Sequence, residues 1–421
     1  MGQTIIQKIL ARAGAGRNVQ PGDIAVVNVD TAVLLDTNFM PHVWREILKL
    51  ADPEKVVVVF DHKVPSNTRV SSQGHITGRE FVKRFGIKRF HDVGPDVGIS
   101  HVIVTDRAYA LPGTVLVCAD SHTCAAGAWN CAARGVGVPE MAYAVTTGKT
   151  WFRVGDTIRY DLTGQLQPGV TTKDVFLQLS QQFGDHTNQN MEFGGAALKA
   201  LSLNARRTIA TQAAEVGAEF ATFEADGVLL DYVRARTKAS FEAQHPDPDA
   251  VYADRRSMDL GKIEPLVALP DSVIKNSVPV GKVAGEPIQQ AFIGSCANGS
   301  LDDLAVAARV VAGRQVAPGI RFIVTPGSQD VYRDALKAGY VATLVEAGAL
   351  VTNATCGACG GGHMGVVGPG ETCITASTRN FKGRMGDPTS RIYMASPATV
   401  AASALTGVIT HPGKFIGEAL T

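Results

Sequence analysis

Short runs of β-branched and apolar residues alternate along the whole chain with patterns typical of helices. Near-continuous apolar runs suit strands of a parallel sheet that is covered on both faces, and their alternation with helical segments is typical of α/β folds. The predicted strands are Lys55–Phe60, His101–Thr105, Thr114–Cys118, Gln290–Ile293, Ile320–Thr325 and Ile392–Ala395. The predicted helices between them include Leu301–Ala312 and Ala398–Thr406. The sequence therefore predicts an α/β fold.

Two changes in composition suggest how the 421 residues divide. A stretch punctuated by glycine and proline begins at Gly155 and ends near Thr171, and residues 244–279 are rich in proline and aspartate. Stretches of this kind commonly connect compact units. We expect three α/β domains, at about residues 1–155, 156–255 and 256–421, with the last one carrying the cysteine motifs described below.

Charge and hydropathy limit the classes of partner. The formal net charge is +1, which argues against nucleic acid or an anionic membrane as the main partner. No apolar run approaches the ~20 residues that span a bilayer. The basic N-terminal segment could be a transit peptide, but Ile5, Ile6, Ile9 and Leu10 recur at helical spacing. We expect an amphipathic helix there and a cytoplasmic protein.

Three of the seven cysteines stand in a metal-binding context. Cys356 and Cys359 form a CxxC motif followed by three glycines, and Cys296 stands in a Gly-Ser-Cys turn at a predicted helix N-terminus, where the helix dipole favours a thiolate. The spacing suits an iron–sulfur cluster, and a zinc site completed by His363 is the alternative. The remaining cysteines are expected to be packing residues: Cys118, Cys124, Cys131 and Cys373.

Other chemical side chains follow the predicted strands directly. Asp61 and His62 follow one strand, and Asp120, Ser121 and His122 follow another. In open α/β sheets, ligands bind at the carboxyl ends of the strands. These polar groups are therefore candidates for a catalytic site.

Four segments together resemble the signatures of one family: ADSHTCAAGA, IGSCANGS, TCGACGGG and ETCITASTRNFKGRMG. They are similar, in this order, to motifs of the aconitase superfamily, and most similar to large subunits of the isopropylmalate dehydratase, homoaconitase and dimethylmalate dehydratase type. The resemblance extends from KILAR near the start to ASALTGVITHP near the end. It implies aconitase-type α/β domains around a central iron–sulfur site.

The resemblance also implies an activity and its cofactor. Members are hydro-lyases that dehydrate and rehydrate a 2-hydroxy di- or tricarboxylic acid, and 3-isopropylmalate or a related alkylmalate is the expected substrate here. Cys296, Cys356 and Cys359 are expected to hold a 4Fe-4S cluster whose fourth iron stays open to substrate. An iron with an open position acts as a Lewis acid on a hydroxyl or a carboxylate.

By the same resemblance, further residues receive roles. Asp61 and His101 match an Asp–His pair, and His122 in the Asp120-Ser121-His122 motif matches a histidine whose carboxylate partner is Glu215. Two arginines match the residues that bind substrate carboxylates, as a guanidinium fork can. These are Arg379 and Arg384.

The chain also departs from the family. Thr211 and Thr378 stand where relatives have asparagines that approach the cluster, Val102 stands where glutamine is common, and Leu35 stands near a frequent histidine. Relatives also have a swivelling fourth domain, either in the same chain or as a separate small subunit. None of the three expected domains corresponds to it, so we expect a separate small subunit as partner. The alternative function is a cluster-free or zinc-stabilised protein with a binding role, for example RNA binding.

Overall fold

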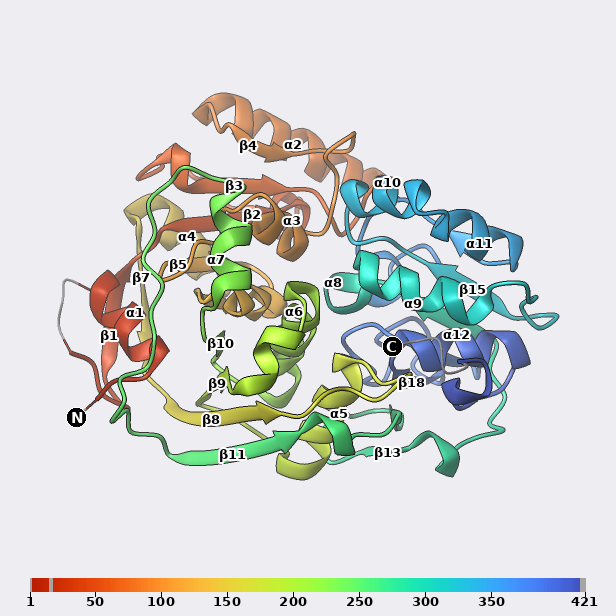
Figure 1. Cartoon of the computed structure of the whole chain (residues 1–421). Coiled ribbons are helices and arrows are strands. Elements are labelled where there is room, and N and C mark those ends of the chain that lie inside the picture. The colour runs from red at the N-terminus through yellow and green to blue at the C-terminus, as the bar shows by residue number, and fades with distance from the viewer. Residues whose placement is uncertain (1, 15–17, 417–421) are drawn as a thin grey trace. The chain divides into compact units, whose positions relative to one another are not determined.

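The computed structural model describes residues 2–14 and 18–416, which divide into two compact units (Figure 1). The first unit consists of the described residues of Met1–Gly94, Ser100–Thr163 and His186–Met258. The second unit consists of Pro95–Ile99, Gly164–Asp185 and the described residues of Asp259–Thr421. Each unit thus draws on segments that are far apart in the sequence. The three predicted domain ranges are a different division and stay a prediction.

Three sheets organise the first unit. The largest has the strand order β4-β3-β2-β5-β6, and every neighbouring pair in it is parallel. A second sheet has the order β10-β9-β8-β11, and β1 pairs with β7 in an antiparallel ribbon. The strands are β1 (Ile24–Asn28), β2 (Thr31–Leu35), β3 (Val56–Val59), β4 (Arg89–His91), β5 (Val115–Cys118), β6 (Ala132–Gly135), β7 (Lys149–Arg153), β8 (Asp156–Thr163), β9 (Gln189–Gly194), β10 (Phe220–Phe223) and β11 (Asp254–Asp259).

Caps define both ends of helix α2 (Arg69–Phe85) of the first unit. In α2, Thr68 accepts a hydrogen bond from the N–H of Ser71 at the start, and Gly86 adopts φ +64° at the end, a conformation that favours glycine. The α-helices are α1 (Ile5–Ala13), α2 (Arg69–Phe85), α3 (Ser100–Asp106), α4 (Val138–Thr147), α6 (Leu203–Gln212) and α7 (Gly227–Arg234). The 3-10 helices are η1 (Asp36–Phe39), η2 (Pro53–Lys55), η3 (Ser121–Trp129), η4 (Ala196–Ala200) and η5 (Ala213–Val216).

One mixed sheet forms the centre of the second unit, with the order β13-β12-β18-β17-β14-β15-β16. The strands from β18 to β16 are parallel neighbours, while β12 runs antiparallel to both β13 and β18. The strands are β12 (Leu266–Ala268), β13 (Ser277–Pro279), β14 (Gln290–Ile293), β15 (Arg321–Val324), β16 (Leu350–Val351), β17 (Thr372–Thr375) and β18 (Arg391–Ala395). Parallel order places the carboxyl ends of these five strands at one edge.

Helices cover this sheet and complete its core. Helices α9 and α12 pack against each other, α12 also contacts β14, and α5 packs on β12 and β13. The helices are α5 (Thr172–Phe183), α8 (Ser295–Asn298), α9 (Leu301–Val311), α10 (Gln329–Lys337), α11 (Tyr340–Glu346) and α12 (Pro397–Thr406), and the 3-10 helices are η6 (Leu260–Lys262), η7 (Val280–Lys282), η8 (Gly357–Gly360) and η9 (Pro412–Lys414).

The α/β prediction is confirmed, and most predicted elements lie within a residue or two of the observed ones. The strand predicted at His101–Thr105 is wrong, because these residues form most of helix α3. A short apolar run does not distinguish a buried helix from a strand, and this helix is buried over most of its length. The cysteines predicted to pack in the core are all buried: Cys118, Cys124, Cys131 and Cys373.

Within the described ranges, none of the helices combines the length and the apolar character that a bilayer-spanning segment requires.

Candidate functional site

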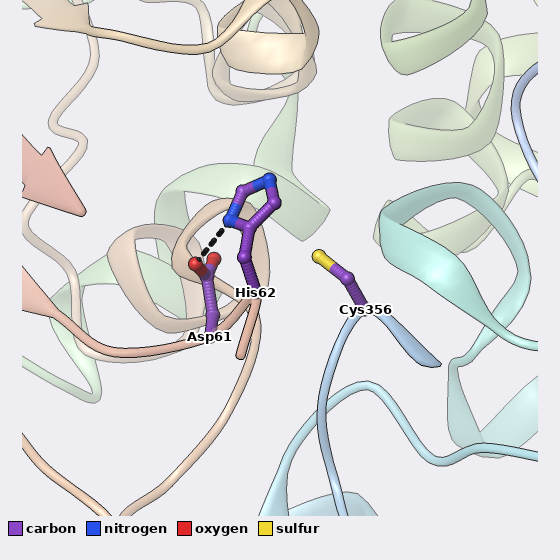
Figure 2. A group of neighbouring side chains, drawn as sticks. All are labelled: Asp61, His62 and Cys356. Atoms are coloured by element: carbon purple, nitrogen blue, oxygen red, sulfur yellow. Dashed lines mark hydrogen bonds and ion pairs between the residues drawn. The ribbon is translucent and has the colours of Figure 1, made fainter. Parts of the chain in front are cut away.

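A turn at the carboxyl end of β3 carries the first histidine–carboxylate pair. The four valines of β3 are fully buried, and the chain leaves the sheet at Asp61 and His62. His62 Nδ1 lies 2.7 Å from Asp61 Oδ1 (Figure 2), and the backbone N–H of Ser100 donates to Asp61 Oδ2 at 2.7 Å. Asp61 is fully buried. The carboxylate is thus fixed by the start of α3 and orients the imidazole of His62.

His101, on helix α3, pairs with Asp120. Its Nε2 lies 2.8 Å from Asp120 Oδ1, and its side chain is buried. The resemblance led us to expect Asp61 as the partner of His101, and that pairing is wrong because Asp61 pairs with His62 instead. The expected pair thus combined one member from each of two neighbouring His–Asp pairs, Asp61–His62 and His101–Asp120.

His122 lies between two carboxylates. Its Nε2 is 2.9 Å from Glu215 Oε1, on η5, as expected from the sequence. Its backbone N–H donates to Asp120 Oδ1 at 2.8 Å, and its Nδ1 lies 3.4 Å from the same oxygen. Burial would lower the pKa of His122, but Asp120 and Glu215 outweigh burial and raise it above the ordinary value.

Asp120 is the centre of this cluster of three histidines. Besides His101 and His122, the Nε2 of His62 lies 3.7 Å from Asp120 Oδ2. Burial opposes ionisation of Asp120, yet hydrogen bonds from the three histidines hold its pKa well below the usual range. For His62, the attraction of Asp61 and Asp120 outweighs burial and raises the pKa well above its ordinary value. The cluster therefore keeps Asp120 ionised and stabilises the protonated imidazoles of His62 and His122.

Ser121 and Thr211, also in the first unit, were predicted to belong to the site. Ser121 is exposed and is the first residue of η3. Thr211 is fully buried on α6, and its hydroxyl donates to the carbonyl of Arg207 at 2.7 Å. The single donor hydrogen of that hydroxyl is therefore used within its own helix.

In the second unit, the topology gathers the cysteine loops at one edge of the sheet. Cys296 lies on α8 directly after β14, and Cys356 follows β16 and begins the turn of η8. Thr378 follows β17. Because β17, β14, β15 and β16 are consecutive parallel neighbours, their carboxyl ends lie side by side.

Two glycines allow these loops to pack closely against the same two side chains, Phe292 and Thr325. A Cβ on Gly294 would lie 2.7 Å from Phe292 Cζ and 3.0 Å from Thr325 Cβ. A Cβ on Gly357, which has φ +59°, would lie 2.9 Å from Thr325 Oγ1 and 3.3 Å from Phe292 Cζ. The loop that contains the CxxC motif and the loop that contains the Gly-Ser-Cys turn therefore pack over one shared pair of residues.

Polar groups surround the sulfur of Cys359. Thr378 Oγ1 lies 3.4 Å from Cys359 Sγ, and Arg384 Nη2 lies 3.7 Å from it. Cys359 and Cys296 are buried, Cys356 is half-buried, and none of the three forms a disulfide. Donors directed at sulfur stabilise a thiolate and tune a metal cluster that it holds.

These residues fit a cluster held by thiolates better than a single zinc ion. A tetrahedral zinc site holds its sulfur ligands about 4 Å apart, since each Zn–S bond is ~2.3 Å. In the described chain, no three of the ligand atoms of Cys296, Cys356, Cys359 and His363 lie within 4.8 Å of one another. A larger cluster tolerates the wider separation, and a guanidinium beside sulfur suits its negative charge.

The two predicted substrate arginines follow β17. Arg379 and Arg384 are both half-buried. Asn380 anchors the segment by donating to the carbonyls of Leu269 at 2.6 Å and Ser272 at 3.2 Å. These hydrogen bonds hold the backbone beside Arg379 in place.

The roles taken from the family resemblance did not include His62. It directly follows Asp61 at the end of a buried strand, and this position alone marks it as a candidate. A lone histidine is more often a structural residue, however, and the family motif used for the other residues did not extend to it. The contacts with Asp61 and Asp120 place His62 in the histidine cluster.

Comparison with known proteins gives a family for the chain. The model of the aconitase family (aconitate hydratase) matches residues 43–286 and 272–407. The 3-isopropylmalate dehydratase large subunit of Mycolicibacterium smegmatis is 52% identical over 99% of both chains. A solved structure, aconitase X of Thermococcus kodakaraensis in its holo-form, is matched over 84% of each chain with 11% identity and a TM-score of 0.48.

Two further relatives cover the chain equally well. The 3-isopropylmalate dehydratase large subunit 1 of Methanopyrus kandleri is 42% identical over 99% of this chain and 100% of its own length. The probable methanogen homoaconitase large subunit of Methanothermobacter thermautotrophicus is 41% identical over 98% of both chains. None of these relatives is named for RNA binding or for zinc. The chain belongs to the aconitase family.

Proposed function

We propose that this chain is the large subunit of an iron–sulfur hydro-lyase that dehydrates and rehydrates 3-isopropylmalate or a related alkylmalate. The observation that carries the proposal is the 52% identity, over 99% of both chains, to a relative named 3-isopropylmalate dehydratase large subunit. Membership of the aconitase family supports the reaction type. The histidine cluster and the cysteine loops supply groups that this chemistry needs.

The reaction is demanding because neither of the two bonds breaks easily: the C–H is a weak acid, and hydroxide is a poor leaving group. A proton must leave a carbon beside a carboxylate, and hydroxide must leave the neighbouring carbon. Cys296, Cys356 and Cys359 would hold a 4Fe-4S cluster, which supplies a Lewis acid toward the leaving hydroxyl when it is bound. With only three cysteine ligands, one iron would be left without a protein thiolate, and the Thr378 hydroxyl and Arg384, at 3.4 and 3.7 Å from the Cys359 sulfur, would stabilise that thiolate.

The histidine cluster supplies the proton transfer to the leaving oxygen. A histidine held protonated by a neighbouring carboxylate is a suitable general acid for a leaving hydroxyl. His62 and His122 each have such a partner, at 2.7 and 2.9 Å, and both have a raised pKa; His101 lies beside them, 2.8 Å from Asp120. Asp120 orients all three rings and stays ionised, so it acts as a positioning residue rather than as a proton donor.

Arg379 and Arg384 would bind the carboxylates of the substrate. A guanidinium forms two parallel hydrogen bonds with a carboxylate and fixes its plane. Fixing a carboxylate also fixes the adjacent carbon whose proton is removed, which lowers the entropy that remains to be lost in the transition state.

The proposal includes a small subunit as partner, supported by the name "large subunit" that the relatives carry. The purified chain should therefore show little turnover until a small subunit is added. We also place the protein in the cytoplasm, which cell fractionation tests.

A panel of substrates tests the proposal. The reconstituted pair of subunits is incubated anaerobically with 3-isopropylmalate, dimethylmalate, methylmalate and homocitrate, and formation of the unsaturated acid is followed by ultraviolet absorbance. We expect the highest kcat/KM with 3-isopropylmalate. Homocitrate as the preferred substrate would overturn the alkylmalate assignment, and no turnover of any acid would overturn the hydro-lyase proposal itself.

A further inference from the structure

Lys173 is a fully buried lysine on helix α5, in the second unit. Among the lysines that the structure describes, it alone is buried, and a lysine is almost never fully buried unless its head group is paired. Its Nζ donates to the backbone carbonyl of Ser377 at 2.8 Å and lies 3.7 Å from Met394 Sδ. The side chain therefore connects α5 to the segment that follows β17, 204 residues later.

This segment carries two residues of the candidate site. Ser377 directly precedes Thr378, whose Oγ1 lies 3.4 Å from Cys359 Sγ, and Arg379. The carbonyl that Lys173 binds belongs to the peptide group that joins residues 377 and 378. Because a peptide group is planar, a hydrogen bond to its oxygen also fixes the direction in which the chain continues to Thr378 and Arg379.

Other hydrogen bonds hold the two ends of the segment. On one side, the N–H of Ala376 donates to the carbonyl of Phe292 at 2.8 Å. On the other side, the carbonyl of Asn380 accepts from the N–H of Asp271 at 3.1 Å. Lys173 binds between these two anchors, at the peptide group from which the Thr378 side chain is directed toward sulfur.

Docking of α5 on the sheet has its own contacts and does not require an amine at this position. Asp174, the next residue, accepts hydrogen bonds from the backbone N–H groups of Leu266 on β12 at 3.0 Å and of Thr171 at 2.9 Å. Val175 and Phe176 on the same helix are fully buried. An apolar side chain in place of Lys173 would add packing without the cost of desolvating a charged group. The carbonyl that Lys173 binds, rather than the packing of α5, therefore accounts for the lysine.

We propose that Lys173 is a positioning residue: its hydrogen bond to the Ser377 carbonyl fixes the 377–378 peptide group, and so directs the Thr378 hydroxyl to Cys359 and places Arg379 for a substrate carboxylate. This inference rests on the proposed function, in which Arg379 binds substrate. Lys173 itself is enclosed in the core and acts only through the segment that it holds.

The test compares the parent with Lys173→Met, which keeps an unbranched side chain and removes the donor. Hydrogen exchange of residues 376–385 is followed by mass spectrometry in the anaerobically purified chain, with samples compared at equal iron content. We expect exchange there to accelerate on the order of tenfold, the scale of one lost hydrogen bond. In the reconstituted enzyme, KM for 3-isopropylmalate should rise about 5–20-fold while kcat changes less than about threefold, because Arg379 would hold the carboxylate equally in the ground state and the transition state.

Asp174→Asn is the matched control, because it changes the next residue of the same helix and weakens the contact with β12 instead. It should lower the free energy of unfolding, yet leave both KM and the exchange of residues 376–385 within about twofold of the parent. Equal changes in the two variants would overturn the proposal, since any loosening of α5 would then suffice. Unchanged exchange, or unchanged KM, in Lys173→Met would also overturn it.

If Lys173→Met does not fold, amine-directed labelling of the folded parent decides. Lys173 should be labelled far more slowly than Lys337, whose side chain is 77% exposed. Labelling of both lysines at the same rate would overturn the contact with Ser377 and the proposal with it.

Failure of the proposed function gives a different result. A parent enzyme that turns over none of the hydroxy acids would contradict the hydro-lyase assignment. Hydrogen exchange needs no turnover, so it reports on the contact between Lys173 and the 376–380 segment by itself.

Discussion

Replacing Glu215 by glutamine tests how strongly this carboxylate stabilises the protonated form of the buried His122. Glu215 Oε1 lies 2.9 Å from His122 Nε2, and the two side chains are 10% and 6% exposed. At this separation two unit charges attract by about 6 kcal/mol in an effective dielectric of about 20. Desolvation of both groups offsets much of this attraction, and Asp120 still faces His122 in the variant. We therefore expect Glu215→Gln to lower the free energy of unfolding by about 1–3 kcal/mol while His122 is protonated.

The loss should depend on pH in a defined direction. The pKa of His122 is raised in the folded protein, so the stabilisation by Glu215 is fully present below the unfolded value of about 6.5 and is lost as the pH rises through the folded pKa. Urea unfolding of the anaerobic chain is measured near pH 6 and near pH 9.5. The difference between parent and variant should be largest at the lower pH and should shrink at the higher one.

Asp226→Asn is the matched control, because Asp226 contacts an arginine, Arg206, at 2.6 Å instead of a histidine. Its effect on unfolding should be the same at both pH values, since arginine stays charged. A pH-independent loss in Glu215→Gln, like that of the control, would refute the argument that Glu215 sets the charge of His122.

Three further substitutions test the proposed site. Arg384→Lys keeps the charge but removes the planar fork, and should lower kcat/KM about 10–100-fold, equal to roughly 1.5–3 kcal/mol; unchanged kinetics would remove Arg384 from the substrate site. Thr378→Val removes the hydroxyl that lies 3.4 Å from Cys359 Sγ, so iron-dependent absorbance should decay faster in air than in Thr378→Ser, and equal rates would count against the contact. Thr211→Asn adds an amide donor where the present hydroxyl donates to Arg207; we expect slower decay, and decay as fast as in the parent rejects that expectation.

Much of the fold follows from local sequence patterns. The valines of β3 and the apolar run of β14 are strands because a buried parallel strand presents both faces to apolar neighbours. The same logic was wrong for residues 101–105, where a helix is buried over most of its length. Periodicity cannot separate the two cases in so short a run.

The sequence predicted the site residues that belong to motifs, but it did not predict which histidine pairs with which carboxylate. The cysteine loops and the His122–Glu215 pair were placed by motif, and the structure brings Glu215 to 2.9 Å of His122. The partners of His101 and His62 depend on which side chains neighbouring strands and α3 bring together. The hydrogen bond from the backbone N–H of Asp61 to Asp36, 25 residues earlier, likewise depends on β2 and β3 being neighbours in the sheet.

Iron and sulfide analysis tests the central claim most directly. The chain is purified anaerobically, and iron, zinc and acid-labile sulfide are measured in the parent, in Cys356→Ala and in Cys373→Ala, whose cysteine is a buried core residue. We predict about four irons and four sulfides per chain in the parent, as a 4Fe-4S cluster requires. Cys373→Ala should keep this content and Cys356→Ala should lose it. Stoichiometric zinc without sulfide in the parent, or a full complement of iron in Cys356→Ala, would contradict the account.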